Sequence, residues 1–411
     1  MPSAITRNSR ATMQTDGLPP PGVGGIPHRY LALDALRGAA AFAVLFYHLR
    51  NLKTPDGSAS PLHAFDSGYL AVDLFFVLSG FVISHAYEKK LRASLSLPAF
   101  MITRFLRLQP VIAIGTLAGF AFALSQRLFG LEGAPGLFAI ATSLPANLLM
   151  LPNVLVPWGI FLFNPPAWSL FYELAANAVY ALGIRMGAAG RGEAEIAKRI
   201  DRALTAICFA GLAGLAASVV LVGNLDKGVV LGDWPVALAR ITFSFALGLL
   251  LHRTRQRWTP RVPRLPMPWL MLACLLVLAP ELEGASRAGY DLVFVLLLSP
   301  ALVMLTSVTQ PTSHQETAAT WLGMISYPLY AIHVPIKHVT ETGLPLGFRS
   351  LGLAPPSFAM LLIVAACSAV AAAWLIGSVV DPALRRWLGT QILPLLAKPA
   401  PIPQPPHSRG A

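Results

Sequence analysis

Long apolar runs recur along almost the whole chain, separated by short polar or proline-rich stretches. A run of about 20 apolar residues is the length of helix that crosses the hydrocarbon core of a bilayer. The pattern therefore predicts an all-α polytopic membrane protein with about ten transmembrane helices. The predicted spans are 31–49, 69–87, 108–126, 166–186, 203–223, 235–252, 267–281, 289–309, 320–338 and 356–379.

The apolar stretch 136–163 is interrupted by Pro145, Pro152 and Pro157 and needs a separate argument. If the amino terminus is cytoplasmic and this stretch does not cross, 22 of the 31 Lys and Arg residues fall in inner segments and seven in outer ones. A crossing there would place the later basic clusters outside, whereas basic loops tend to stay in the cytoplasm. We expect both termini in the cytoplasm and 136–163 as an interfacial or re-entrant element.

Composition supports the same class. Of 411 residues, 55% are hydrophobic and only 12% are charged, whereas soluble domains carry roughly 25% charged residues. The net charge of +12 follows from the basic inner segments, so no nucleic-acid partner is expected. No CxxC pair or His/Cys spacing predicts a metal site. We expect residues 1–28 and the proline-rich tail 391–411 to be disordered, flanking a membrane domain over 29–390.

Charged side chains inside predicted spans are costly and are candidates for function. In the first span, Arg37 and His48 are eleven positions apart, which places both on one helical face about 16 Å apart along the axis. Asp34 shares that face and can pair with Arg37. The second span carries Asp73 near its outer end. The alternative interpretation of the first span is a structural Asp–Arg pair with a histidine at the interface.

Two arginines, Arg104 and Arg107, lie three residues apart at the cytoplasmic mouth of the third span. Guanidinium groups bind phosphate in a bidentate manner, which would suit a phosphorylated ligand arriving from the cytoplasm. Spacing alone fits contact with lipid headgroups equally well.

The fourth and ninth spans carry further polar residues. Trp168 and Glu173 open the fourth span, and Ser326 and His333 share a face of the ninth with Tyr330 beside them. Polar contacts between helices would explain both groups without any chemistry. The predicted topology nevertheless places the acids and histidines in the outer halves of their helices and the arginine pair at the inner mouth. This layout predicts a polar path through the protein.

Five segments together resemble the acyltransferase 3 family of bacterial membrane acyltransferases. The resemblance covers residues 29–388, nearly the whole predicted membrane domain. The matching features are Leu33–Gly38 with the Arg37-to-His48 spacing, Phe75–Gly80, Phe100 with Arg104 and Arg107, Trp168–Glu173, and Ser326, Tyr327, Tyr330 and His333.

The resemblance implies transfer of an acyl group, often acetyl, from cytoplasmic acyl-CoA to a hydroxyl of a carbohydrate or glycoside. It also implies a multi-pass protein of the bacterial cytoplasmic membrane, with acyl-CoA as co-substrate and no permanently bound cofactor. Under this reading His48 is the general base or a transient acyl carrier. Glu173 or Asp73 would orient the imidazole.

The remaining residues receive binding roles under the same resemblance. Arg104 and Arg107 would hold coenzyme A phosphates, and Arg37, paired with Asp34, would steady the donor. The acceptor site would be shaped by His333, Tyr330, Ser326 and Trp168.

Two other classes of protein would also place ionisable residues in the membrane. An exporter or proton-coupled transporter would move an unmodified solute and would be indifferent to acyl-CoA. A non-catalytic subunit of an envelope complex would tolerate loss of His48 and Arg37. The glycerolipid acyltransferases are disfavoured because the chain has no His-x4-Asp pair.

Overall fold

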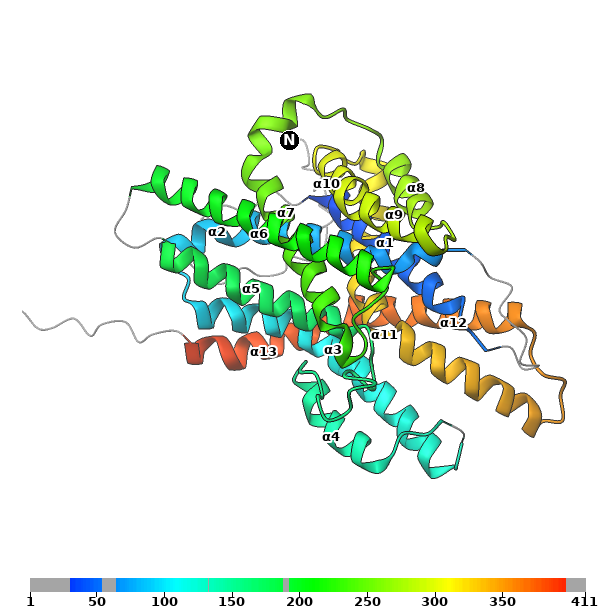
Figure 1. Ribbon diagram of the computed structural model, residues 1–411. Coiled ribbons are helices and arrows are strands. Elements are labelled where there is room, and N and C mark those ends of the chain that lie inside the picture. Colours follow the sequence, from blue (N-terminus) through cyan, green and yellow to red (C-terminus); the bar gives the residue numbers. More distant parts are fainter. Residues whose placement is uncertain (1–29, 54–63, 132, 188–191, 397–411) are drawn as a thin grey trace, which may run out of the picture.

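The structure is a computed structural model that describes residues 30–53, 64–131, 133–187 and 192–396. Every regular element in these ranges is helical, which confirms the predicted all-α class (Figure 1). The α-helices are α1 (Leu31–Leu49), α2 (Ala71–Ala93), α3 (Leu97–Leu128), α4 (Leu137–Leu148), α5 (Ala167–Gly187), α6 (Glu193–Val222), α7 (Trp234–Trp258), α8 (Met267–Val277), α9 (Gly284–Val293), α10 (Ser299–Ser307), α11 (Ser313–Ser350), α12 (Phe358–Leu375) and α13 (Asp381–Leu396).

Short helical turns connect or extend several of these helices. The 3-10 turn η1 (Asp66–Leu70) leads into α2, and π-helical segments η4 (Phe294–Leu298) and η5 (Ile376–Val380) join α9 to α10 and α12 to α13. Two further 3-10 turns, η2 (Leu231–Asp233) and η3 (Thr259–Arg261), flank α7. Several predicted spans therefore correspond to a continuous helical segment that changes between α-helix and 3-10 or π-helix along its length.

Within the described ranges, seven helical segments are long and apolar enough to cross a membrane. They are Leu31–Leu49, Asp66–Ala93, Leu97–Leu128, Glu193–Val222, Leu231–Arg261, Gly284–Ser307 and Phe358–Gln391. The predicted spans 166–186 and 320–338 also lie in long helices, α5 and α11, which are not among the seven. Helix α5 carries Glu173 and Arg185, and α11 carries several charged residues, histidines and prolines. A multi-pass helical membrane protein is thus confirmed, while the number ten and the cytoplasmic position of the termini stay predictions.

Two short apolar helices bear on the predicted topology. The 12 residues of α4 extend about 18 Å and the 11 residues of α8 about 16 Å, both less than the roughly 30 Å of a hydrocarbon core. The short length of α4 agrees with the prediction that the 136–163 element does not cross the membrane. The second means that the predicted span 267–281 does not form a crossing helix by itself, because the helix ends at Val277, before the acidic loop that follows.

The carboxyl-terminal boundary also differs from the prediction. Helix α13 continues to Leu396 and so overlaps the first part of the tail 391–411 that the sequence predicts as disordered. Residues 392–396 are apolar, and prolines become dense only after Lys398. The predicted disordered segment 1–28 and the tail beyond 396 lie outside the described residues.

Close helix packing centres on α1 and α2. Helix α1 packs chiefly against α11, and α2 against α7, which also lies along α6. Gly80 of α2 and Gly248 of α7 make the second contact possible: a Cβ on Gly80 would lie 2.2 Å from the carbonyl oxygen of Phe245, and one on Gly248 2.1 Å from that of Val77. Small residues allow such approach of helix backbones in membranes.

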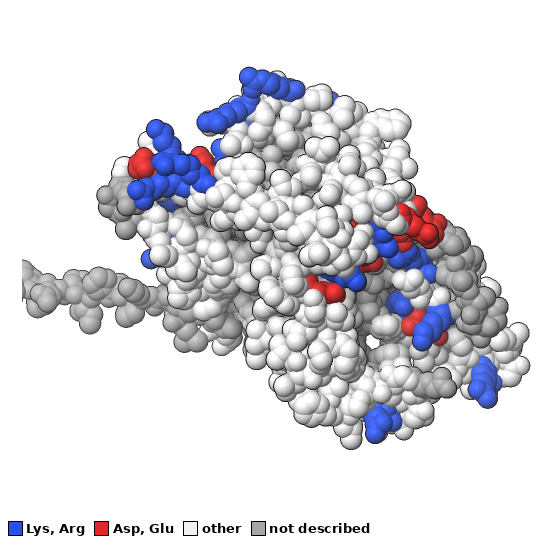
Figure 2. All heavy atoms as spheres, in the orientation of Figure 1, with Lys and Arg blue, Asp and Glu red and all other residues white. Residues whose placement is uncertain are grey.

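Charges gather at the ends of the bundle. Figure 2 shows Lys and Arg over the start of α6 and the end of α7, and an uncharged surface over much of the bundle between them and the charged groups at the opposite end. An uncharged belt between charged ends is what a bilayer-spanning bundle requires.

Candidate functional site

Two histidines meet between α1 and α11. The Nε2 atom of His333 lies 3.1 Å from the Nδ1 atom of His48, and the ring centroids are 4.7 Å apart. His333 is 1% exposed, and His48 is partly exposed in the last turn of α1. Both were predicted as site residues from separate segments, and the packing of α1 on α11 brings them into direct contact.

Backbone carbonyls fix the tautomers of this pair. The Nδ1 atom of His333 lies 3.0 Å from the carbonyl oxygen of Leu329, and that of His48 lies 3.0 Å from the carbonyl oxygen of Val44. A carbonyl oxygen only accepts, so both Nδ1 atoms carry the hydrogen. In neutral rings His333 Nε2 is then an acceptor for the same His48 N–H. This assignment leaves a lone pair on His48 Nε2, for which no partner occurs in the described ranges.

The predicted pair at the start of α1 is present. Arg37 Nη1 donates to Asp34 Oδ1 at 3.1 Å, and both side chains are partly exposed on a helix whose other faces are largely buried. Gly323 of α11 packs against Asp34, where a Cβ would lie 2.7 Å from the Asp34 Cβ. Helical periodicity along the continuous α1 places Arg37 on the same face as His48.

Glu173 does not contact the histidines and is paired with Arg104 instead. Arg104 Nη2 lies 2.8 Å from Glu173 Oε1, which also accepts a 2.6 Å hydrogen bond from Ser79 Oγ. The sequence interpretation placed this acid at the outer end and Arg104 at the inner mouth. That separation is wrong, because α3 and α5 pack together and bring the two side chains to one level.

The Nε donor of Arg104 is not used. Its side chain is 5% exposed, and its Nε atom is buried with no hydrogen-bond partner in the described residues. Arg107 is exposed and forms no ion pair within the same residues. The two arginines predicted to act together therefore differ, since one is buried and paired while the other is accessible.

Asp73 is also committed to an arginine. Arg240 of α7 donates to Asp73 Oδ2 from Nη2 at 2.7 Å and from Nε at 3.0 Å. The same guanidinium donates to the carbonyl oxygens of Leu225, Lys227 and Tyr69, so it ties the loop after α6 to the start of α2. The predicted contact of Asp73 with the imidazole is not formed, and the pair has the character of a structural clamp.

Two of the four predicted acceptor residues, Tyr330 and His333, lie beside each other, whereas Trp168 and Ser326 contact other residues. Tyr330 and Ser169 hydroxyls lie 2.7 Å apart, and Tyr330 also donates to the carbonyl oxygen of Pro166. Trp168 is buried, with the Arg240 guanidinium 5.5 Å from its ring centre. Ser326 donates within its own helix, to the carbonyl oxygen of Gly323. Tyr330 is the link to the histidines, since its ring centre is 6.0 Å from that of His333.

A polar network at the carboxyl-terminal end of α1 was missed from the sequence. Tyr47, next to His48, donates to both oxygens of Asp226 at 2.8 Å, and Arg287 donates to the same carboxylate at 3.0 Å. The signal available was only that charged residues occur in three of the segments predicted to lie outside, which does not say that they meet. These groups border the histidine pair, because the Tyr47 and His48 ring centres are 4.9 Å apart.

A second group flanks the pair on α11. Glu341 is bonded to Lys337 at 3.2 Å and to His338 at 2.9 Å. Burial alone would raise the pKa of Glu341, but these two bases hold it below its usual value.

In the described ranges, no three His, Cys, Asp or Glu residues are grouped so as to hold a metal ion.

Comparisons with known proteins point to one family. A family model described as an acyltransferase domain matches residues 30–377. The chain is 37% identical over 165 residues to "Protein 2 in picA locus" of Rhizobium radiobacter, a match covering 38% of this chain and 82% of that protein. It is 38% identical over 87 residues to the peptidoglycan O-acetyltransferase OatA of Listeria monocytogenes, covering 20% of this chain but 12% of OatA. No solved structure matches the chain.

Proposed function

The chain belongs to the acyltransferase 3 family, and we propose that it is a membrane O-acyltransferase that moves an acyl group, acetyl in the simplest case, from acyl-CoA to a carbohydrate hydroxyl. The relative named as a peptidoglycan O-acetyltransferase supports both the O-linked product and the glycan acceptor. The donor would reach the protein from the cytoplasm and the acceptor from the outer end of α1, in a bacterial inner membrane.

The histidine pair carries this proposal. His48 Nε2 accepts the proton of the acceptor hydroxyl as its oxygen attacks the thioester carbonyl carbon. The carbon–sulfur bond breaks as the tetrahedral intermediate collapses, and the proton passes from the imidazolium to the departing thiolate. His333 Nε2, 3.1 Å from His48 Nδ1, accepts the hydrogen bond that orients the base and stabilises its transient charge.

His333 therefore takes the orienting role that the sequence assigned to a carboxylate. A neutral imidazole can do this because its own Nδ1 hydrogen is held by the Leu329 carbonyl oxygen, which leaves Nε2 as the acceptor. Asp73 and Glu173 support the site indirectly, by fixing Arg240 and Arg104.

The arginines would handle the donor. Arg107, exposed and without an ion pair in the described ranges, is the residue we assign to the diphosphate of coenzyme A. The buried Nε of Arg104 offers a fixed donor further in, and Arg37 lies on the histidine face of α1. A buried, preorganised guanidinium is suited to the developing charge of a thioester oxygen.

The test compares wild type with His48→Ala and with His314→Ala, an exposed histidine at the start of α11. Purified protein is given acetyl-CoA and a crude envelope glycan fraction, and thiol release is followed beside mass spectrometry of the glycans. We expect an acetylated glycan from wild type and His314→Ala, and a loss of about 10²–10⁴-fold in His48→Ala. Full activity of folded His48→Ala would refute the assignment. Neither binding nor turnover of acetyl-CoA by folded wild type would favour transport instead.

A further inference from the structure

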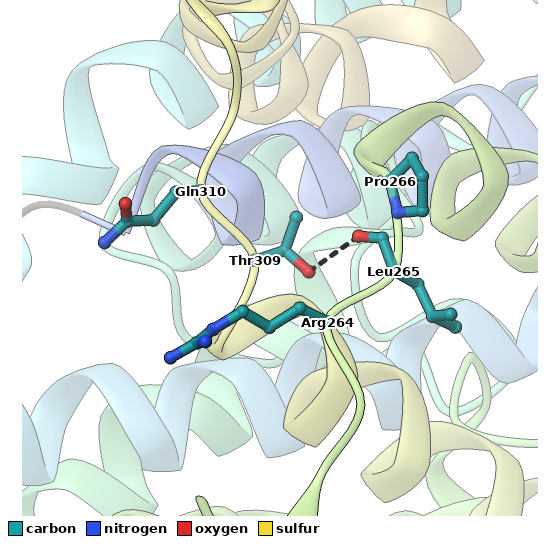
Figure 3. A pocket seen from close by; sticks show the side chains of 5 residues that line it. All are labelled: Arg264, Leu265, Pro266, Thr309 and Gln310. Atoms are coloured by element: carbon teal, nitrogen blue, oxygen red, sulfur yellow. Dashed lines mark hydrogen bonds between the residues drawn. The ribbon is translucent and has the colours of Figure 1, made fainter.

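A cavity of about 750 Å³ lies at the end of the bundle where α1 begins and α7 ends. A second cavity of about 500 Å³ shares three of its lining residues, Arg264, Thr309 and Gln310, so the two adjoin (Figure 3). Neither Arg104 nor Arg107 lines them, and the proposed chemistry at the histidine pair uses no residue of this region. The volume is in the range of pockets that enclose small organic ligands, roughly 300–1,000 Å³.

One side of the larger cavity is aromatic. Tyr30, Phe81 and Trp258 line it from three different elements. The Trp258 ring is held by its Nε1–H, which donates to the Leu251 carbonyl oxygen at 3.0 Å, and the Tyr30 ring lies edge-on to Phe81 with centroids 5.6 Å apart. Aromatic rings held in this way offer flat faces on which a base can stack.

The other side is cationic. Arg255 and Arg264 line the cavity, against a single acidic residue, Glu316. Arg264 is exposed and makes no ion pair in the described part of the chain, so its charge is available to a ligand. In Figure 3 its guanidinium and the Gln310 amide extend to the same side, where both could bind an anion. Guanidinium groups favour phosphate.

A hydrogen bond holds together two of the segments that line the cavity. The Thr309 hydroxyl donates to the Leu265 carbonyl oxygen at 3.1 Å and so joins the segment after α10 to the segment before α8 (Figure 3). These two segments carry Gln310 and Arg264. A ligand would therefore meet a largely formed site, which reduces the ordering cost of binding.

We propose that this cavity binds a phosphorylated purine nucleotide, with the base against Trp258 and Tyr30 and a phosphate on Arg264 and Arg255. An anionic lipid headgroup would use the arginines but would leave the aromatic side unoccupied. The nucleotide could be the 3′-phosphoadenosine end of the donor, in which case this inference rests on the proposed function, or a free nucleotide.

Binding is measured first, because it needs no turnover. Full-length protein in detergent is titrated with 3′-phosphoadenosine 5′-diphosphate, and Arg264→Gln is compared with Arg257→Gln, an exposed arginine of α7 outside the lining. We expect binding by wild type and Arg257→Gln, and affinity weaker by about tenfold or more in Arg264→Gln, as for loss of a charge-assisted hydrogen bond. No binding by wild type, or equal affinity of both variants, would overturn the proposal.

Kinetics then separate the two sources. If the donor occupies the cavity, Arg264→Gln raises KM for acetyl-CoA with kcat unchanged and leaves KM for acetyl-phosphopantetheine, which lacks the nucleotide, as in wild type. If a free nucleotide occupies it, binding falls while KM for acetyl-CoA stays constant. Nucleotide binding by a protein that never turns over acyl-CoA would uphold the cavity and refute the proposed activity.

Discussion

Replacing Asp73 by Asn tests whether this acid supports the fold or takes part in the reaction. Its carboxylate and the Arg240 guanidinium are 0% and 1% exposed, and two hydrogen bonds of 2.7 and 3.0 Å join them. Asn removes the charge and leaves a buried cation without compensation. Breaking a buried pair from one side costs about 3–5 kcal/mol, which is a large part of the stability of most proteins.

The assay is thermal unfolding of purified protein in detergent. Ser244→Ala is the matched control, because it removes only the 3.3 Å hydrogen bond to Asp73 and is expected to cost about 1 kcal/mol. We expect Asp73→Asn to unfold at a clearly lower temperature than this control. Arg240→Met should be at least as destabilising as Asp73→Asn, because it leaves the buried carboxylate unpaired and also removes the donor of three carbonyl oxygens.

Two outcomes for Asp73→Asn distinguish a structural from a chemical role. If Asp73→Asn unfolds like wild type yet loses acyl transfer, the structural interpretation is refuted and the acid belongs to the reaction, as the sequence suggested. If it is unstable but the protein that does fold keeps acyl transfer, the carboxylate has no chemical role.

Three further predictions follow from other contacts. Glu173→Gln removes the charge that faces buried Arg104 and should lower stability by about 3 kcal/mol, measured by thermal unfolding; unchanged stability would contradict the pairing. His333→Phe removes the acceptor behind the reacting imidazole and should lower kcat about 10²-fold with little change in KM for acetyl-CoA; an unchanged kcat would exclude the orienting role. Gly80→Val places carbon against the α7 backbone and should reduce the yield of folded protein, whereas Gly183→Val, with nothing near its Cβ, should not.

Much of the fold could be predicted from local sequence. Apolar runs of sufficient length predicted α1, α3, α6, α7 and α12, because a bilayer selects helices by length and apolarity alone. Predictions from local sequence were less accurate for the ends of helices. The run at α8 ends as a short helix, and α13 extends past the expected start of the tail.

The candidate site divides in the same way. The Asp34–Arg37 pair and the face that Arg37 shares with His48 follow from helix geometry, so the sequence by itself determined them. The partners across helices, His48 with His333 and Glu173 with Arg104, were decided only by the tertiary structure. The physical reason is that periodicity fixes which face a side chain occupies on its own helix, but the neighbour on that face depends on which helices pack together and at what relative height.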